Sequence, residues 1–169
     1  GYNGSENFAK GKRFGFFPSL AIGWLMSEEP WMQKYHKTFN KIKFRASVGK
    51  AGDDNIGGRR FAYLTPMNTN AEGYVLGTTG QSSYTGITEG DIGVSNLTWE
   101  TVKKYNVGFE LGLWNMLDFN LDIFRENRSN IFMKRTIIPT QSGFINAPWA
   151  NFGKVTNGGV DMSLNFHKQ

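Results

Sequence analysis

The chain has 169 residues, of which 21 are glycine, none is cysteine and 15% are aromatic. The lack of cysteine excludes disulfide bonds, a thiolate nucleophile and a cysteine-ligated metal site. The formal net charge of +5 would suit a nucleic-acid partner, but the basic residues are spread along the chain rather than clustered, so we expect no nucleic acid as a partner.

Five segments alternate apolar and polar residues with the period of two that is typical of β-strands. In chain order they occupy residues 14–26, 41–49, 104–114, 118–124 and 159–166. In the second, KIKFRASVG, Ile42, Phe44 and Val48 would point to one side and Lys43 and Arg45 to the other. We therefore expect an all-β, antiparallel fold whose strands each have one apolar face. No apolar run approaches the about 20 residues of a membrane-spanning helix.

The connections between these segments alternate in length. Residues 27–40 form a moderate turn, with a short helical stretch expected near Pro30, and residues 115–117 form a tight hairpin turn. The other two connections, residues 50–97 and 127–152, are long, and the first is rich in Gly, Ser, Thr and Asn. A structureless loop of that length is unusual in a compact soluble domain. Short turns on one side and long loops on the other are typical of outer-membrane β-barrels.

Two interpretations of the apolar faces remain open at this point. In a transmembrane barrel they would contact lipid, and Trp24, Trp99, Tyr105 and Trp114, which lie near strand ends, would form interfacial girdles. In a soluble β-sheet binding module, such as a lectin-like or adhesin domain, the same faces would pack in a core. The opposite faces carry mostly Gly, Ser, Asn and Asp rather than long charged side chains, which favours the barrel.

Four motifs follow one another along the chain: GFFPSLAIGWLMSEE, FRASVGKAGDDNIG, NLTWETVKKYNVGFELGLWN and NFGKVTNGGVDMSLNF. Together they resemble the C-terminal part of the barrel of SusC/RagA-like TonB-dependent transporters of the Bacteroidetes outer membrane. The resemblance covers nearly the whole chain. It departs from the usual family pattern at Asp53, where Asn is usual, and at Asp161, where Glu is usual.

This resemblance implies a fold, a location and partners. The fold would be a segment of about five strands from a large transmembrane β-barrel, with short periplasmic turns and long extracellular loops. Residues 1–169 would be a partial barrel domain that contains neither the plug domain nor the signal peptide of the family. The implied function is import of glycans or peptides across the cell outer membrane with a SusD-like surface lipoprotein, driven by the TonB complex through N-terminal regions outside this segment. The segment would contact outer-membrane lipid and oligosaccharide or peptide cargo, without a cofactor and without enzymatic activity.

The stretch GGRRFAY supplies the candidate ligand-binding residues. Arg59 and Arg60 offer forked donors to carboxylates or hydroxyls. Tyr63, and Tyr84 further along the same connection, offer rings on which sugars or peptide side chains stack. The alternative is that these side chains pack the loop or contact a neighbouring loop or anionic lipopolysaccharide.

Three other patterns are interpreted as structural, so we expect no catalytic residue and no metal site. AGDDNIGG lacks the later Glu of a Ca²⁺ loop, so we expect a tight turn in which Asp and Asn bond to the local backbone. The turn-like residues 156–159 suggest a β-bulge. The carboxylates on the polar faces lie on separate strands, which does not suit the paired acids of a glycosidase; they are Glu110, Asp118, Asp122 and Asp161.

Overall fold

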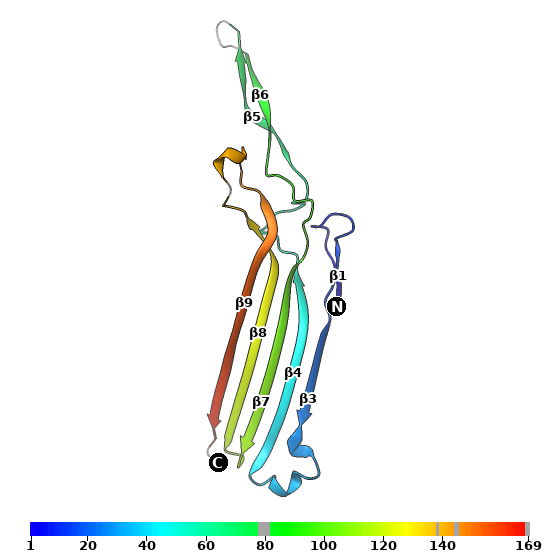
Figure 1. Cartoon of the computed structure of the whole chain (residues 1–169), viewed down its shortest axis with the longest axis vertical. Coiled ribbons are helices and arrows are strands. Elements are labelled where there is room, and N and C mark those ends of the chain that lie inside the picture. Colours follow the sequence, from blue (N-terminus) through cyan, green and yellow to red (C-terminus); the bar gives the residue numbers. More distant parts are fainter. Residues whose placement is uncertain (78–81, 138, 144–145, 168–169) are drawn as a thin grey trace.

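The computed structural model describes residues 1–77, 82–137, 139–143 and 146–167. An antiparallel sheet of five strands forms its main body, in the order β3-β4-β7-β8-β9 (Figure 1). These strands are β3 (Ser19–Leu25), β4 (Phe39–Asp53), β7 (Glu100–Leu113), β8 (Leu117–Lys134) and β9 (Trp149–Phe166). The all-β, antiparallel fold expected from the sequence is confirmed. Within the described ranges, no helix is long and apolar enough to cross a membrane.

The connection between β3 and β4 contains two short 3-10 turns in place of the single helical stretch expected near Pro30. They are η1 (Met26–Glu28) and η2 (Gln33–Tyr35). A tight turn joins β7 to β8, as expected, with the backbone N–H of Met116 donating to the carbonyl of Leu113 at 3.0 Å. These two connections lie at the same end of the sheet, which we call the short-turn end (Figure 1).

The connections at the opposite end, the long-loop end, are more structured than the sequence indicated. The region 50–97 contains a hairpin of β5 (Met67–Leu76) and β6 (Ser82–Glu89), which projects beyond the sheet (Figure 1). Strand β8 runs on to Lys134, so its connection to β9 is shorter than the predicted 127–152 and holds the 3-10 turn η3 (Thr140–Ser142). At the long-loop end both faces of a strand can be polar, so alternation of apolar and polar residues no longer predicts where a strand lies. The chain begins with a small hairpin of β1 (Tyr2–Gly4) and β2 (Phe14–Phe16).

The register of the sheet gathers the large apolar residues on one face, the apolar face. Register partners line up in rows that cross the five strands. One row consists of Trp24, Phe44, Phe109, Leu121 and Met162. Apolar side chains on this face are widely exposed, including Ile22 (67%), Val160 (63%) and Leu164 (64%). A soluble module would cover such residues with a core, whereas a barrel wall presents them to lipid.

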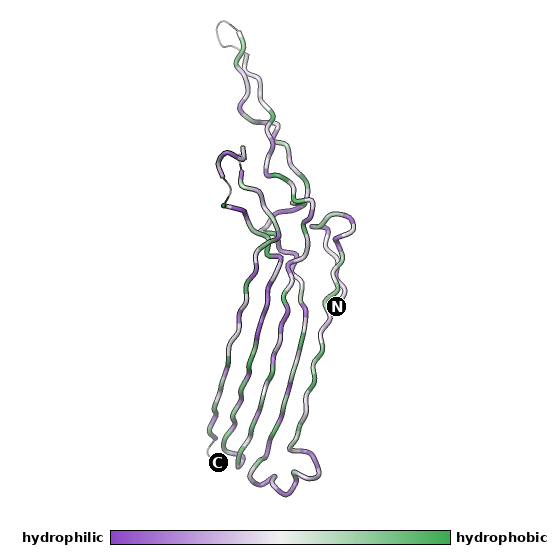
Figure 2. The backbone as a smooth tube through the Cα atoms, viewed as in Figure 1, coloured by the Kyte–Doolittle hydropathy of each residue, from purple (hydrophilic) through white to green (hydrophobic). Residues whose placement is uncertain are grey.

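The apolar face forms a band of limited height. On β7 it runs from Leu113 to Tyr105, and the next residue on this face is Lys103, whose partner on β4 is Lys50. Eight residue steps span about 27 Å along the strand. With a strand tilt of about 40°, the band is about 20 Å tall, close to the about 25 Å of outer-membrane barrels. Figure 2 shows apolar and polar residues alternating along the strands.

A cluster of buried apolar side chains closes the long-loop end of the sheet. Phe8 and Phe17 lie 5.1 and 5.2 Å from the ring of Trp99, measured between ring centroids. The Phe17 ring lies against β4 because Gly52 has no side chain there; a Cβ would come within 2.0 Å of it. The prediction that Trp99 belongs to an interfacial girdle is therefore wrong, since it is 8% exposed. The other members of the cluster are Ile56, Val94 and Leu97.

The predicted bulge at residues 156–159 is also wrong. Thr156 to Gly159 pair with β8 in unbroken register. The irregularity between β8 and β9 lies instead between Ser129 and Phe132. Asn130, at its centre, has a φ of 59°, a backbone conformation that asparagine tolerates better than most residues. The glycine-rich motif on β9 therefore forms regular strand.

Candidate functional site

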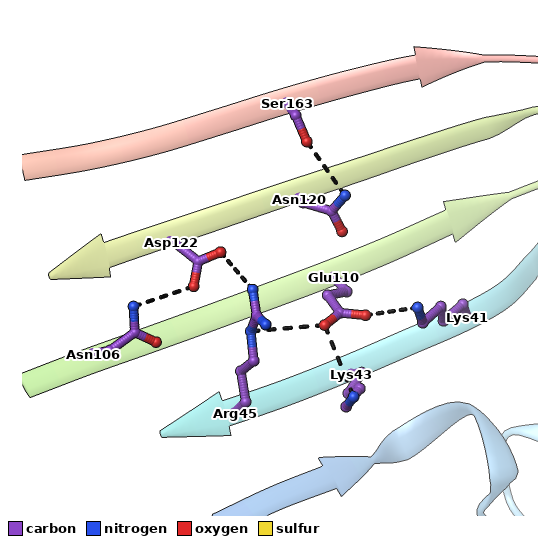
Figure 3. A network of polar contacts seen from close by, with 8 residues as sticks. All are labelled: Lys41, Lys43, Arg45, Asn106, Glu110, Asn120, Asp122 and Ser163. Carbon is purple, nitrogen blue, oxygen red and sulfur yellow. Dashed lines mark hydrogen bonds and ion pairs between the residues drawn. The ribbon is translucent and has the colours of Figure 1, made fainter. Parts of the chain in front are cut away.

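The polar face of the sheet carries a group of charged, amide and hydroxyl side chains, which we call the wall network (Figure 3). Contacts connect six of them, and the amide of Asn120 donates to Ser163 as a separate pair. Its members come from four neighbouring strands, because alternate residues of each strand point to this face. They are Lys41, Lys43 and Arg45 on β4, Asn106 and Glu110 on β7, Asn120 and Asp122 on β8, and Ser163 on β9.

Glu110 lies at the centre of the wall network. Its side chain is only 11% exposed, and the Nζ of Lys41 lies 2.6 Å from its Oε2. The Nζ of Lys43 and the Nε of Arg45 lie 3.9 and 3.6 Å from its Oε1. Because three cations surround one largely buried carboxylate, its position on the wall is fixed electrostatically.

Arg45 reaches across β7 to a third strand. Arg45, Gly108 and Asp122 are successive register partners on β4, β7 and β8. The Nη2 of Arg45 lies 2.5 Å from Oδ2 of Asp122, and the amide of Asn106 donates to the other oxygen at 3.3 Å. A Cβ at Gly108 would come within 2.2 Å of the Nε of Arg45. The missing side chain at Gly108 therefore makes room for this contact.

Three of the four carboxylates of the polar face lie beside basic side chains. Glu110 and Asp122 belong to the wall network, and Asp118 lies 3.3 Å from Nε2 of His167. Asp161 is the register partner of Asp122 on β9. A glycosidase holds two carboxyl groups on either side of a bound sugar, and only one of them is ionised at the start of reaction. Glu110 and Asp122 are each held by ion pairs instead, which gives the sheet a hydrophilic face.

The turn after β4 has the structure expected from AGDDNIGG. The backbone N–H of Asn55 donates to Oδ1 of Asp53 at 2.9 Å, and that of Gly57 donates to Oδ1 of Asn55 at 3.0 Å. Gly57 and Gly58 have φ values of 69° and 75°, which glycine adopts without a steric cost. These are two consecutive Asx turns, and the prediction of a structural turn is confirmed.

Of the candidate ligand-binding residues, Arg59 is the most tightly held. It forms an ion pair with Asp91, and its guanidinium carbon lies 4.4 Å from the ring centroid of Trp149. Trp149 in turn stacks on Phe132, with ring centroids 5.2 Å apart. Arg59 therefore links the long connection after β4 to the start of β9.

Arg60 is more open to solvent than Arg59. Its side chain is 70% exposed and lies 2.6 Å from the carboxylate of Glu6. Both arginines line a hollow of about 510 Å³ together with Phe61 and Ile92. The hollow combines apolar surface with forked donors, so it has room and chemistry for part of a polar ligand.

The two tyrosines lie in different places. Tyr63 is half-buried and contacts Phe61 edge-on, with ring centroids 6.2 Å apart. Tyr84 is 58% exposed on β6, where its register partner is Tyr74. The structure thus groups Arg59, Arg60 and Tyr63 at the base of the long connection and places Tyr84 on the projecting hairpin. Ligand contact by these four residues stays a prediction.

Sequence reasoning named the carboxylates of the wall network but missed their basic partners. The alternation of the sequence predicts that Lys43 and Arg45 lie on the polar side of a strand, and it assigns no position to Lys41. The pairing of Lys43 with Glu110, and of Arg45 with Gly108, depends on the register of β4 against β7. These strands are separated by the whole region 54–99, so no local turn predicts that register.

Nearly the whole chain matches known proteins. Residues 1–167 match the family model described as TonB dependent receptor-like, beta-barrel. The chain is 34% identical to the TonB-dependent receptor P26 of Formosa agariphila over 96% of its length, and 30% identical to the TonB-dependent receptor SusC of Bacteroides thetaiotaomicron over 97%. It spans 16% of the length of each of these relatives.

Solved structures show the same fold. The RagAB peptide importer in its closed-closed state matches with a TM-score of 0.77 at 22% identity, covering 99% of this chain and 17% of that one. The open-open state of the same importer gives a TM-score of 0.72. The resemblance inferred from the sequence motifs is confirmed. By its family model and its relatives, the chain belongs to the TonB-dependent receptor-like β-barrel family.

Proposed function

We propose that this segment forms part of the wall and outer loops of a TonB-dependent transporter in the cell outer membrane. The transporter imports glycans or peptides and works with a SusD-like surface lipoprotein. Its energy comes from the TonB complex, which contacts other parts of the protein. The segment performs no enzymatic reaction of its own, and residues 1–169 serve as a partial barrel domain.

One observation carries this proposal: the two faces of a single sheet have opposite chemistry. The apolar face is exposed over a height close to that of an outer-membrane barrel, and the other face carries the wall network. A soluble binding module would have to cover the apolar face. In a transporter, the apolar face contacts lipid and the wall network lines the aqueous interior.

The long-loop end then lies outside the cell, and its side chains are the first to meet cargo. Family members have long loops on the extracellular side and short turns on the periplasmic side. Arg59, Arg60 and Tyr63 would contribute to the outer vestibule, with Tyr84 reaching further out on β6. Peptide cargo is supported by the likeness to the solved structures, which belong to a peptide importer. Glycan cargo is supported by the resemblance of the sequence motifs to SusC/RagA-like transporters.

The test is an uptake assay on the full-length parent transporter. Arg60, Tyr63 and Tyr84 are replaced together by alanine, and uptake of labelled oligosaccharide and peptide mixtures is measured in cells. Uptake should fall while the amount of assembled barrel in the outer membrane stays normal. A matched control replaces Lys34, His36 and Lys37 at the short-turn end, and should leave uptake unchanged. Normal uptake in the triple variant would remove these residues as a site. A parent protein that fractionates outside the outer membrane would refute the proposal itself.

A further inference from the structure

Four basic residues lie at or just beyond the outer margin of the apolar band, on the apolar face of the sheet. Lys50 and Lys103 are register partners, and Arg125 is the partner of Tyr105. Lys154 is the partner of Ser129, which lies on the same face as Arg125, four residues further along β8. We call these four residues the outer basic patch.

The outer basic patch has no ion-pair partner among the described residues. The basic residues of the opposite face at the same height do have partners: Lys104 lies 2.9 Å from Glu126, and Arg128 lies 2.7 Å from Glu100. Like charges directly opposite each other on neighbouring strands, as at Lys50 and Lys103, destabilise the pairing. The ammonium of Lys50 lies 5.9 Å from the centroid of the Phe17 ring, which carries no compensating charge. The other residues in the two rows that contain Lys50, Lys103 and Lys154 are uncharged: Gly52, Thr101, Asn127, Ser129 and Thr156.

The patch is compact enough for one anionic headgroup. Lys50 and Lys103 lie on neighbouring strands, about 5 Å apart at the backbone, and Arg125 lies diagonally from Lys103 at about 7–8 Å. Lys154 lies two strands and one row away from Lys103, at about 12 Å. The side chains of Lys103, Arg125 and Lys154 are exposed, so they are free to converge on a shared ligand.

An apolar furrow leads from the patch into the band. Lys50 and Lys103 line a hollow of about 360 Å³ whose floor includes Leu20, Val48 and Tyr105. A second hollow, of about 260 Å³, follows at the next row, where the small side chain of Ala46 lies among larger neighbours. These neighbours are Ile22, Trp24, Phe44 and Val107. The two hollows succeed each other along β4, with the cations at the outer end and apolar side chains below.

We propose that the outer basic patch and this furrow bind a phosphorylated glycolipid of the outer leaflet. The four cations hold its phosphate groups, and one of its acyl chains lies in the furrow over Ala46. Lysine and arginine bind phosphate through charge-assisted hydrogen bonds, and basic clusters at a membrane surface attract anionic lipids. A soluble anion would not need the furrow, and an uncharged lipid would not need the cations.

This inference rests on the proposed location in the outer membrane. The test uses the full-length parent, purified and reconstituted into nanodiscs of a zwitterionic phospholipid. Native mass spectrometry counts bound molecules of three probes: lipid A with its phosphates, the same glycolipid after phosphatase treatment, and phosphatidylglycerol. The patch variant carries Lys50→Gln, Lys103→Gln, Arg125→Gln and Lys154→Gln. A control variant with the same charge change carries Lys10→Gln, Lys12→Gln, Lys34→Gln and Lys37→Gln.

We expect the parent and the control variant to bind phosphorylated lipid A in preference to the other two probes. The patch variant should bind it at least about tenfold more weakly, since each cation near the surface contributes separately. Ala46→Leu, which fills the furrow and leaves the charges in place, should also weaken binding. Rising salt concentration should displace lipid A from the parent, a result that requires no variant to fold.

Two results would overturn the proposal. One is equal binding of lipid A by the parent and the patch variant. The other is equal binding by the parent of the phosphatase-treated glycolipid or of phosphatidylglycerol, because the site would then not recognise a phosphorylated glycolipid. Cell fractionation and uptake are also measured on the unsubstituted parent. A parent with normal location and uptake that binds no lipid A would likewise refute this inference and leave the proposed transporter function standing.

Discussion

Arg45 and Asp122 are joined across an intervening strand, with Nη2 of the arginine 2.5 Å from Oδ2 of the aspartate. The two residues belong to β4 and β8, and the arginine crosses β7 directly above Gly108. One side chain thus connects three neighbouring strands on the polar face. This contact makes a glycine in the middle of a strand a structural requirement.

Gly108→Ala should lower the free energy of unfolding of the parent barrel by about 1–3 kcal/mol, because the added methyl overlaps Arg45 and displaces it from Asp122. Gly23→Ala is the matched control. Gly23 lies on the same face, and its added Cβ would find its nearest neighbour at 3.8 Å. Urea titration in lipid vesicles measures the free energy of unfolding of the parent and of both variants. Equal stability of the two variants would show that the crossing contact contributes nothing.

Glu110→Gln should destabilise the wall network by leaving three cations without their shared carboxylate. The cations are 40–46% exposed, so solvent screens part of the loss, and we expect about 1–2 kcal/mol. Adding Lys41→Gln to the same protein should recover part of that stability, because Lys41 is the closest cation. A urea titration of the two single variants and the double variant gives the coupling energy, and additive effects would contradict this account.

The two faces of β9 should differ sharply in their tolerance of charge. Met162 lies in the middle row of the apolar band, and Ser163 follows it on the polar face. Met162→Arg should cost about 2–4 kcal/mol, as expected for a cation near the bilayer midplane, whereas Ser163→Arg should cost less than about 1 kcal/mol. Folding titrations into vesicles compare the two. A similar cost at both positions would refute the assignment of the apolar face to lipid.

Arg59 should restrain the long connection after β4, whereas Arg60 should not. Arg59→Ala removes the ion pair with Asp91 and the contact with the Trp149 ring, worth together about 1–2 kcal/mol locally. Amide exchange of the Val94 N–H, which donates to the Ala62 carbonyl, should then become about five- to thirtyfold faster. Hydrogen-exchange mass spectrometry measures this exchange rate, with Arg60→Ala as the control. Unchanged exchange in Arg59→Ala would show that other contacts hold the connection.

The segment expressed by itself should aggregate or require detergent. Its sheet leaves β3 and β9 as unpaired edges, and its apolar face has nothing to cover it in the described part of the chain. Size-exclusion chromatography with light scattering tests this in buffers with and without detergent. A monodisperse monomer in plain buffer would favour the soluble binding module.

The strands inside the apolar band could be predicted because one face of each strand is apolar and the other polar, which requires strict alternation along the sequence. Ile42, Phe44 and Val48 are examples, and all lie on the expected face. Beyond the band the alternation is lost, because Arg125 and Asn127 occupy apolar-face positions of β8. The sequence pattern therefore does not predict the part of β8 that continues to Lys134. The burial of Trp99 could not be predicted for a different reason: its partners Phe8 and Phe17 come from a distant part of the chain.

The candidate site was predictable only where it depends on local sequence. The turn at Asp53 and Asn55 follows from side chains bonding to the backbone two residues on, and it was found. The partners of Arg59 and Arg60 are Asp91 and Glu6, which lie 32 and 54 residues away in sequence. No pattern of composition or spacing identifies such contacts before the fold is known.

The crossing of Arg45 over Gly108 has a consequence for assembly. Strands β7 and β8 are aligned by the tight turn that joins them, but β4 must find β7 across the whole region 54–99. A slip of two residues would keep every apolar residue on the lipid side, so hydrophobicity cannot reject it. The same slip would still place a cation, Lys41 or Arg45, opposite Glu110, but it would move Arg45 from Gly108 to Asn106 or Glu110. The side chains of those residues fill the space that Gly108 leaves open, so they would block the path of Arg45 across β7 to Asp122. The fit between one arginine and one glycine therefore selects a single pairing among several that hydrophobicity alone would accept.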